Sequence, residues 1–315
     1  MIQPFFGGGP MIISASRRTD IPALYAQWFK HRLEAGVFYA QNPFNPKQIR
    51  RIERSKIDGF VFWTRNAAPF MNVLDSLGDI PYYFHYTITP YDTDMETNLP
   101  PVVTRMKQFM ELSSRIGSKR IIWRYDPIFI NNLYTPKKHL EMFENMARTL
   151  RGYTDTCVIS FTNVYRKNKA ALHRLGHREL SNDSKKCFLK AMEAIANDNG
   201  MRLLSCSEAT HLKRAACIDA SKLSSIAGKT LHVPRDKHQR TGCACVISKD
   251  IGVYNTCVHG CAYCYATHNR EKSWYNYNHH DIQDPLITGP LPANEVACKT
   301  QGQPSLFEKG YEDNE

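Results

Sequence analysis

Short runs of apolar, β-branched and aromatic residues alternate with longer segments of helical periodicity over the first two hundred residues. Pro, Gly, Asn or Asp bounds the apolar runs, as is usual for strands. These runs predict strands at residues 11–14, 37–41, 59–63, 82–88, 120–123, 158–161 and 202–205. The segments between them predict helices at residues 21–35, 69–77, 101–116, 136–151 and 181–197, several with Pro in the first turn or a preceding Thr, Asp or Ser.

Alternation of strands with helices of this length is typical of βαβ units and a parallel sheet. The number of units favours a full or partial parallel β/α barrel, and we predict an α/β fold with residues 1–200 as the barrel-like core. Residues 201–268 are rich in Cys, Lys, Arg and His, which predicts a cysteine-rich, metal-binding region that completes the barrel. Residues 269–315 are rich in Pro, Gly and Asn and end acidic, which predicts an extended or disordered tail.

Composition narrows the class of protein. Hydrophobic residues make up 42% of the 315 residues and charged residues 23%, as in an ordinary globular protein. No apolar run approaches the roughly 18 residues that span a membrane, and the N-terminus lacks the basic start of a signal peptide. We therefore expect a cytoplasmic protein without membrane contact.

The charge balance points to anionic partners. Lys and Arg number 41 against 30 Asp and Glu, a net charge of +11. Such an excess attracts nucleic acid and phosphorylated substrates. Because no block of consecutive basic residues marks a patch, a scattered basic surface remains the alternative.

The ten cysteines are the most informative residues of the chain. In a reducing cytosol, clustered cysteines are more often metal ligands or redox groups than disulfides. Cys257, Cys261 and Cys264 form a CxxxCxxC motif, which lets one short loop supply three thiolates to a [4Fe–4S] cluster and leaves the fourth iron open. Zinc sites more often use paired CxxC units, so a zinc knuckle with Cys243, Cys245 or His259 is the alternative.

A second set of cysteines lies upstream of this motif. Cys206, Cys217, Cys243 and Cys245 supply four potential ligands, enough for a second cluster or a tetrahedral zinc site. The alternative is that Cys206 and Cys217 are simply buried thiols.

The predicted strands end in polar residues. Active sites of parallel α/β folds lie beyond the carboxyl ends of the strands. The guanidinium groups at those ends predict an anion pocket, formed by Arg17, Arg18, Arg65 and Arg124.

Carboxylates and amides at the same strand ends are candidates for binding or catalysis. Asp20, Asp126 and Glu208 could hold hydroxyl groups of a ligand or move protons. For Asp20 and Asn66, capping of a helix is an equally good explanation.

The segment 254–266, with Tyr263 directly before the last cysteine, resembles the cysteine loop of radical S-adenosylmethionine (SAM) enzymes of the spore photoproduct lyase type, a DNA-repair enzyme. In those enzymes the open iron binds the amino and carboxylate groups of SAM, and an electron from an external donor cleaves its carbon–sulfur bond. The resemblance implies SAM as a cofactor. The residues it implies around SAM or an anionic substrate are Tyr263, Arg17, Arg18, Arg65, Asn66 and Arg124.

A wider resemblance rests on residues 12–22, 42–46, 62–66 and 123–127, together with 250–252 and the cysteine loop. These segments resemble the domain-of-unknown-function family 1848 (DUF1848) up to about residue 289, with Arg65 where Lys is expected. The family name implies no activity.

The cysteine loop comes late in this chain, whereas in radical SAM barrels it follows the first strand. A circular permutation with residues 251–254 as the opening strand would reconcile the two, because barrel termini lie close together. No clear Gly-Gly-Glu run is present to hold the SAM amino group.

These features predict a [4Fe–4S] radical SAM-like enzyme acting on an anionic, nucleic-acid-derived substrate. The alternative is a non-catalytic iron–sulfur or zinc protein that binds nucleic acid. A hydrolase lacks any HExxH or GxSxG signature. Residues 303–307 resemble the peptide by which bacterial repair proteins dock on the DNA sliding clamp, with Leu306 and Phe307 for an apolar pocket and Gln303 for register.

Overall fold

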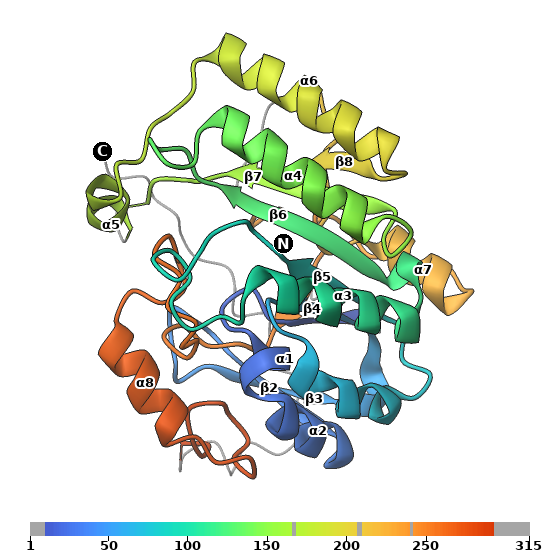
Figure 1. Ribbon diagram of the computed structural model, residues 1–315. Helices are drawn as coiled ribbons and strands as arrows, with labels where there is room; N and C mark the ends of the chain where they lie inside the picture. Colours follow the sequence, from blue (N-terminus) through green and yellow to red (C-terminus); the bar gives the residue numbers. More distant parts are fainter. Residues whose placement is uncertain (1–9, 166–167, 207–209, 240–241, 293–315) are drawn as a thin grey trace, which may run out of the picture.

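The computed structural model describes residues 10–165, 168–206, 210–239 and 242–292. A seven-stranded parallel sheet organises these residues (Figure 1), with strands in the order β8-β7-β6-β5-β4-β1-β9. The strands are β1 (Met11–Ala15), β4 (Ile57–Thr64), β5 (Tyr82–Thr87), β6 (Ile121–Ile128), β7 (Thr156–Phe161), β8 (Arg202–Ser205) and β9 (Lys249–Asp250). The predicted α/β class and parallel sheet are confirmed.

The strand order is sequential from β1 to β8, and β9 then returns to the free edge of β1. Ile13 pairs with Lys249 and Ser14 with Asp250, and the Ile251 amide donates to the Ser14 carbonyl at 3.1 Å. The strand thus lies just before the predicted opening strand at residues 251–254. Within the described residues β8 and β9 are the two edges of the sheet, which is compatible with a partial parallel β/α fold and does not show a closed barrel.

Several helices cover one face of the sheet, and α7 (Ala220–Ala227) packs on the other. Asp20, Thr135 and Ser181 are among the residues whose side chains cap helix starts. The α-helices are α1 (Ile21–Leu24), α2 (Ala26–Glu34), α3 (Val102–Ile116), α4 (Pro136–Leu150), α5 (Lys169–Arg174), α6 (Asn182–Asp198), α7 (Ala220–Ala227) and α8 (Arg270–Asn278), and the 3₁₀ helices are η1 (Arg54–Lys56), η2 (Ala68–Leu77) and η3 (Ser118–Arg120). In the described part of the chain, no helix is both long and apolar enough to cross a membrane.

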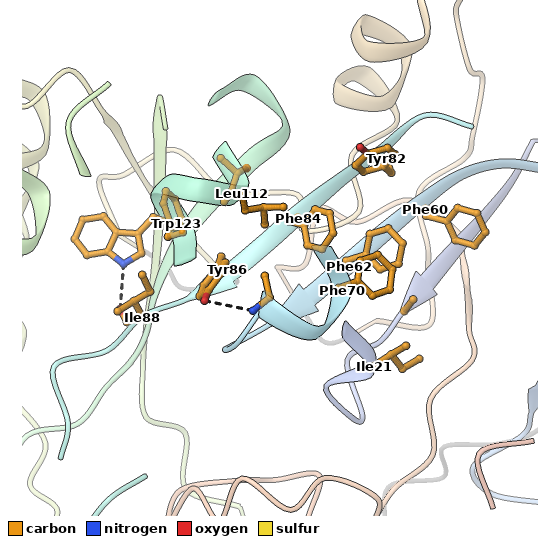
Figure 2. Close-up of a cluster of buried hydrophobic side chains, with 14 of the residues drawn as sticks. Ile21, Phe60, Phe62, Phe70, Tyr82, Phe84, Tyr86, Ile88, Leu112 and Trp123 are labelled. Carbon is orange, nitrogen blue, oxygen red and sulfur yellow. Dashed lines mark hydrogen bonds between the residues drawn. The ribbon is translucent and has the colours of Figure 1, made fainter. Parts of the chain in front are cut away.

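Alternate strand residues form the core beneath α1–α4, α6 and η2 (Figure 2). Phe62 stacks on Phe84 with ring centroids 4.7 Å apart, and Phe70 of η2 lies 4.9 Å from Phe62. Each such side chain contributes about 1.5–3 kcal/mol when fully buried. This aromatic layer holds the helices on one face of the sheet.

The intervening residues point to the opposite face. Val61, Tyr83 and Ile122 pack there against Leu223 of α7 and against buried residues of the cysteine-rich region, among them Ile218 and Cys245. The cysteine-rich region therefore fills the face of the sheet that the other helices leave open.

Three predicted elements differ from the structure. The strand at residues 37–41 is β2 (Val37–Gln41), which pairs antiparallel with β3 (Ile49–Glu53) in a separate hairpin because the connection is too short for a crossover to a parallel strand. The helix predicted at 21–35 breaks at Tyr25, and that predicted at 69–77 is the 3₁₀ helix η2.

The predicted extended tail also differs. Residues 270–278 form α8, which begins where the Asn269 side chain accepts the Lys272 amide at 2.8 Å. Tyr277 of α8 contacts Tyr25, with ring centroids 6.0 Å apart. The N-cap and the aromatic contact thus stabilise the helix that this polar segment forms.

Candidate functional site

Asp250 fixes the start of the cysteine loop, residues 251–268, at the carboxyl end of β9. Its carboxylate accepts hydrogen bonds from Ser14 Oγ at 2.6 Å, Ser16 Oγ at 2.7 Å, and the amides of Arg17 and Gly252, both at 2.9 Å. A Cβ at Gly252 would lie 1.9 Å from Ser16 Oγ, so only glycine allows the approach of the two segments. Burial would raise the pKa of Asp250, but the nearby guanidiniums hold it below its usual value.

Asn255 closes the loop on itself. Its backbone has φ 56°, a left-handed value that Asn tolerates better than most residues. Its side-chain oxygen accepts hydrogen bonds from the backbone amides of His268 at 3.0 Å and Asn269 at 3.1 Å. Its backbone amide donates to the Ala266 carbonyl at 3.0 Å. The ends of the cysteine loop are therefore joined independently of any metal.

The three thiols of the motif lie within electrostatic reach of one another. Burial, followed by Cys264, raises the pKa of Cys257. Burial also raises the pKa of Cys261 to about 12, with Arg65 acting in the opposite direction. The amides of Ala266 and Thr267 each donate to Cys264 Sγ at 3.3 Å. All three cysteines are free and partly accessible.

Two further contacts tie the loop to the sheet through His259 and Asp20. His259 Nε2 lies 2.8 Å from Asp20 Oδ2, which also accepts the Arg65 amide at 2.7 Å. Asp20 Oδ1 caps α1 by accepting the Ala23 amide at 3.0 Å. Asp20 was predicted either to cap a helix or to take part in binding or catalysis. In the structure it caps α1 and also contacts the cysteine loop.

A buried carboxylate that the sequence pattern did not single out, Glu96, binds the aromatic residue of the motif. Its carboxylate accepts a hydrogen bond from the Tyr263 hydroxyl. It accepts a second from Thr89 Oγ1, at 2.5 Å. It also pairs with Arg65 Nη1 at 2.6 Å and Arg105 Nη2 at 2.8 Å. We call Glu96, Arg65, Arg105, Thr89 and Tyr263 the Glu96 cluster.

One of the predicted anion-binding residues, Arg65, belongs to the Glu96 cluster and pairs with its carboxylate. The Arg65 guanidinium lies 5.5 Å from the Tyr263 ring centre, over its face. Burial would lower the pKa of Arg65, but Tyr263, Cys261 and Glu96 raise it. Glu96 was missed because it lies in an irregular segment, where no strand end or spacing marked it.

Arg124 and Asp126 form a second buried pair. Both lie inside β6, which is longer than predicted, rather than beyond its end. Arg124 Nε donates to Asp126 at 2.9 Å, and Arg65 Nη2 donates to the Asp126 carbonyl at 3.3 Å. Burial would raise the pKa of Asp126, but Arg124 and the Ser160 hydroxyl lower it.

Arg17 and Arg18 flank the start of the loop. Arg17 Nε lies 3.7 Å from Asp250, and Arg17 Nη1 donates to Gln239 at 3.1 Å. Arg18 Nη1 donates to the Gly252 carbonyl at 3.3 Å, and its guanidinium lies 5.5 Å from the Tyr254 ring centre. One carboxylate thus faces two guanidiniums.

Asn66 is a local cap in the structure. Its side chain accepts the Ala68 amide at 3.2 Å, just before η2. Glu208 and residues 303–307 lie outside the described residues.

The second set of cysteines meets on the opposite face of the sheet from the helices. Cys206 Sγ lies 3.6 Å from Cys217 Sγ, Cys217 is hydrogen-bonded to Cys245, and Cys245 to Cys243. The hydrogen bond from Cys245 lowers the pKa of Cys243 to about 6. The structure thus brings together four thiols from separate parts of the sequence. Across the described residues, no three or more Cys, His, Asp or Glu side chains already stand in the arrangement of a metal centre.

A pocket of about 250 Å³ opens beside the cysteine loop. Its lining includes Cys257, Gly260, Asn98, Arg270 and Trp274. The arginines of the predicted anion pocket do not line this pocket. Cys257 is therefore accessible from a side of the loop that those arginines do not border.

Comparison with known families identifies the chain. Residues 12–266 match the family described as domain of unknown function (DUF1848), and the chain belongs to that family. No curated protein and no solved structure matches the chain.

Proposed function

We propose that this protein is a radical SAM-type enzyme whose [4Fe–4S] cluster is held by Cys257, Cys261 and Cys264. The position of the cysteine loop carries the proposal. The loop follows β9, which pairs in parallel with β1 at one edge of an otherwise sequential sheet. Read from that edge, the order is strand, cysteine loop and then the remaining strands, which is the order expected of a circularly permuted radical SAM barrel.

The donor set of the loop fits an iron–sulfur cluster. Three thiols come from one loop, and backbone amides already donate to Cys264 Sγ. Such hydrogen bonds to sulfur stabilise thiolate ligands and tune cluster potential. When bound and reduced, the cluster would supply the electron that cleaves SAM.

The chain's own residues would orient the loop and balance charge. The Glu96 cluster fixes Tyr263 and holds Arg65 near Cys261, where a guanidinium offsets thiolate charge. Asp20 fixes His259 in the middle of the motif. Each contact comes from a strand end or loop at the carboxyl edge of the sheet, where parallel α/β enzymes bind substrates.

An anionic substrate is favoured by the charge beside the loop. Arg65 and Arg124 are paired with buried carboxylates, which leaves Arg17 and Arg18 as the better candidates for an external anion. Asp250 offsets only one of their two charges. With the net charge of +11, this supports a substrate that carries phosphate or carboxylate, including one derived from nucleic acid.

Anaerobic reconstitution with iron and sulfide tests the cluster. Wild-type protein should bind about four iron atoms in the cysteine loop. Cys257→Ala, Cys261→Ala and Cys264→Ala should each lose the iron–sulfur absorption, whereas Cys187→Ala, at an exposed cysteine of α6, should keep it. Full absorption in all three motif variants would overturn the proposal.

Incubation with SAM and a chemical reductant, in place of the cell's electron donor, separates an enzyme from a binding protein. The radical SAM proposal predicts 5′-deoxyadenosine from the wild type and none from Cys257→Ala. A stable cluster that never yields 5′-deoxyadenosine would favour the alternative, a non-catalytic iron–sulfur protein that binds nucleic acid.

A further inference from the structure

The second set of cysteines is buried and drawn from three segments. Cys206 follows β8, Cys217 precedes α7, and Cys243 and Cys245 lie in the segment before β9. Each is less than a tenth exposed, and all four belong to the core on the face that the cysteine-rich region covers. Buried Cys commonly packs as a small apolar residue, but four thiols from three segments that contact one another also form the donor set of a structural zinc site.

The spacing of the thiols discriminates between kinds of metal site. Zinc–sulfur bonds of about 2.3 Å in a tetrahedron put neighbouring sulfurs about 3.8 Å apart. Cys206 Sγ and Cys217 Sγ lie 3.6 Å apart. Thiolates on different irons of a cubane are farther apart, since two irons and a sulfide separate them. The observed distance therefore matches two ligands of one metal ion, either zinc or one iron of a [2Fe–2S] cluster, and does not match two corners of a cubane.

The surroundings suit thiolate ligands. The Ile218 amide donates to Cys245 Sγ at 3.4 Å, and Arg124 Nη1 donates to Cys217 Sγ at 3.0 Å. A zinc ion with four thiolates carries two negative charges. Arg124 contacts this set directly, and Cys245 and Cys217 are among the groups that raise the pKa of Arg17 against the effect of burial. Arg124 and Arg17 thus offset part of the charge that metal binding would create, in addition to pairing with Asp126 and Asp250.

We propose that Cys206, Cys217, Cys243 and Cys245 bind one structural zinc ion, which fixes the cysteine-rich region on the open face of the sheet. Binding would replace the four thiol protons with zinc. The site is independent of the proposed iron–sulfur cluster, because no residue is shared between the two sets.

Metal analysis of the full-length protein tests the site. Wild-type protein and the iron-free triple variant Cys257→Ala/Cys261→Ala/Cys264→Ala should each hold one zinc ion per chain after dialysis against a weak chelator. Cys217→Ser and Cys245→Ser should lose it. Cys157→Ser, which removes a buried thiol from the helix-covered core, should keep it.

X-ray absorption at the zinc edge of the wild type covers the case in which the ligand variants fail to fold. It should show four sulfur neighbours at about 2.3 Å. The proposal is overturned by zinc with nitrogen or oxygen neighbours, by extra iron atoms in place of zinc, by a Cys206–Cys217 disulfide in freshly purified protein, or by four thiols that stay metal-free when zinc is supplied.

Discussion

Glu96 connects Tyr263 of the cysteine loop to Arg65, which follows β4, and to Arg105 of α3. Its side chain and that of Arg105 are each 1% exposed, and the pair lies at 2.8 Å. Removing one partner of a buried ion pair leaves an uncompensated charge and typically costs about 3–5 kcal/mol. Glu96→Gln should therefore lower the free energy of unfolding of the iron-free protein by about 3 kcal/mol, measured by urea denaturation.

Glu144→Gln is the matched control for this substitution. Glu144 pairs with Arg148 at 3.0 Å on the surface of α4, where more than half of each side chain is exposed. Exposed pairs contribute less than about 1 kcal/mol. Equal destabilisation by the two substitutions would contradict the role assigned to Glu96.

The buried ring of His139, which lies outside both cysteine sets, should make the stability of the fold depend on pH. Its ring contacts the Tyr125 hydroxyl at 2.7 Å and the Phe129 carbonyl at 2.9 Å, and burial lowers its pKa to about 4. Because the folded pKa lies below the unfolded value of about 6.5, the stabilisation is complete above pH 6.5 and declines as the pH falls towards 4.

Between pH 7.5 and 4.5 this difference in pKa amounts to about 2.5 kcal/mol of stability. The unfolding free energy of the wild type should fall by that much more than that of His139→Gln over the same interval. His173→Gln, at an exposed histidine of α5, controls for the loss of a titrating ring. Parallel pH profiles for the wild type and His139→Gln would refute the assignment.

At the scale of elements, β9 and the cysteine loop act as one unit. Gly252 lets the loop leave β9 against Ser16, and any Cβ there would overlap the serine side chain. Gly252→Ala should push the loop away from β1 and reduce iron uptake several-fold, measured by iron content after reconstitution, with the circular dichroism of the fold retained. Gly176→Ala, whose Cβ would meet open space but whose φ of 67° strains any residue with a side chain, controls for destabilisation away from the loop and should keep wild-type iron content.

Comparison of the predicted strands with the observed ones shows which elements local sequence patterns can identify. The predicted strand at residues 202–205 agrees with β8, because short apolar runs bounded by turn residues suffice to identify a buried strand. β9 was placed two residues too late, because a two-residue strand has no periodicity and is defined only by its partner, β1. The antiparallel pairing of β2 was missed because its partner β3, with two exposed arginines and an acidic end, was not predicted as a strand.

At the scale of the whole molecule, the candidate site depends on contacts between distant parts of the chain. The three motif cysteines are visible in the sequence because they are neighbours. Glu96 lies 167 residues before Tyr263 in the chain and could not be assigned in this way, since only the fold brings the two together. The same applies to Arg65 and Arg124, whose exposed strand-end positions were expected to bind anions and which instead pair with Glu96 and Asp126.

The electron paramagnetic resonance spectrum of the reduced protein, recorded with and without SAM, tests the central claim most directly. An open iron that binds SAM predicts a cluster signal in the wild type that changes shape when SAM is added, and no such signal in Cys261→Ala. A reduced wild-type protein without a cluster signal, or with a signal that SAM leaves unchanged, would contradict the proposed radical SAM function.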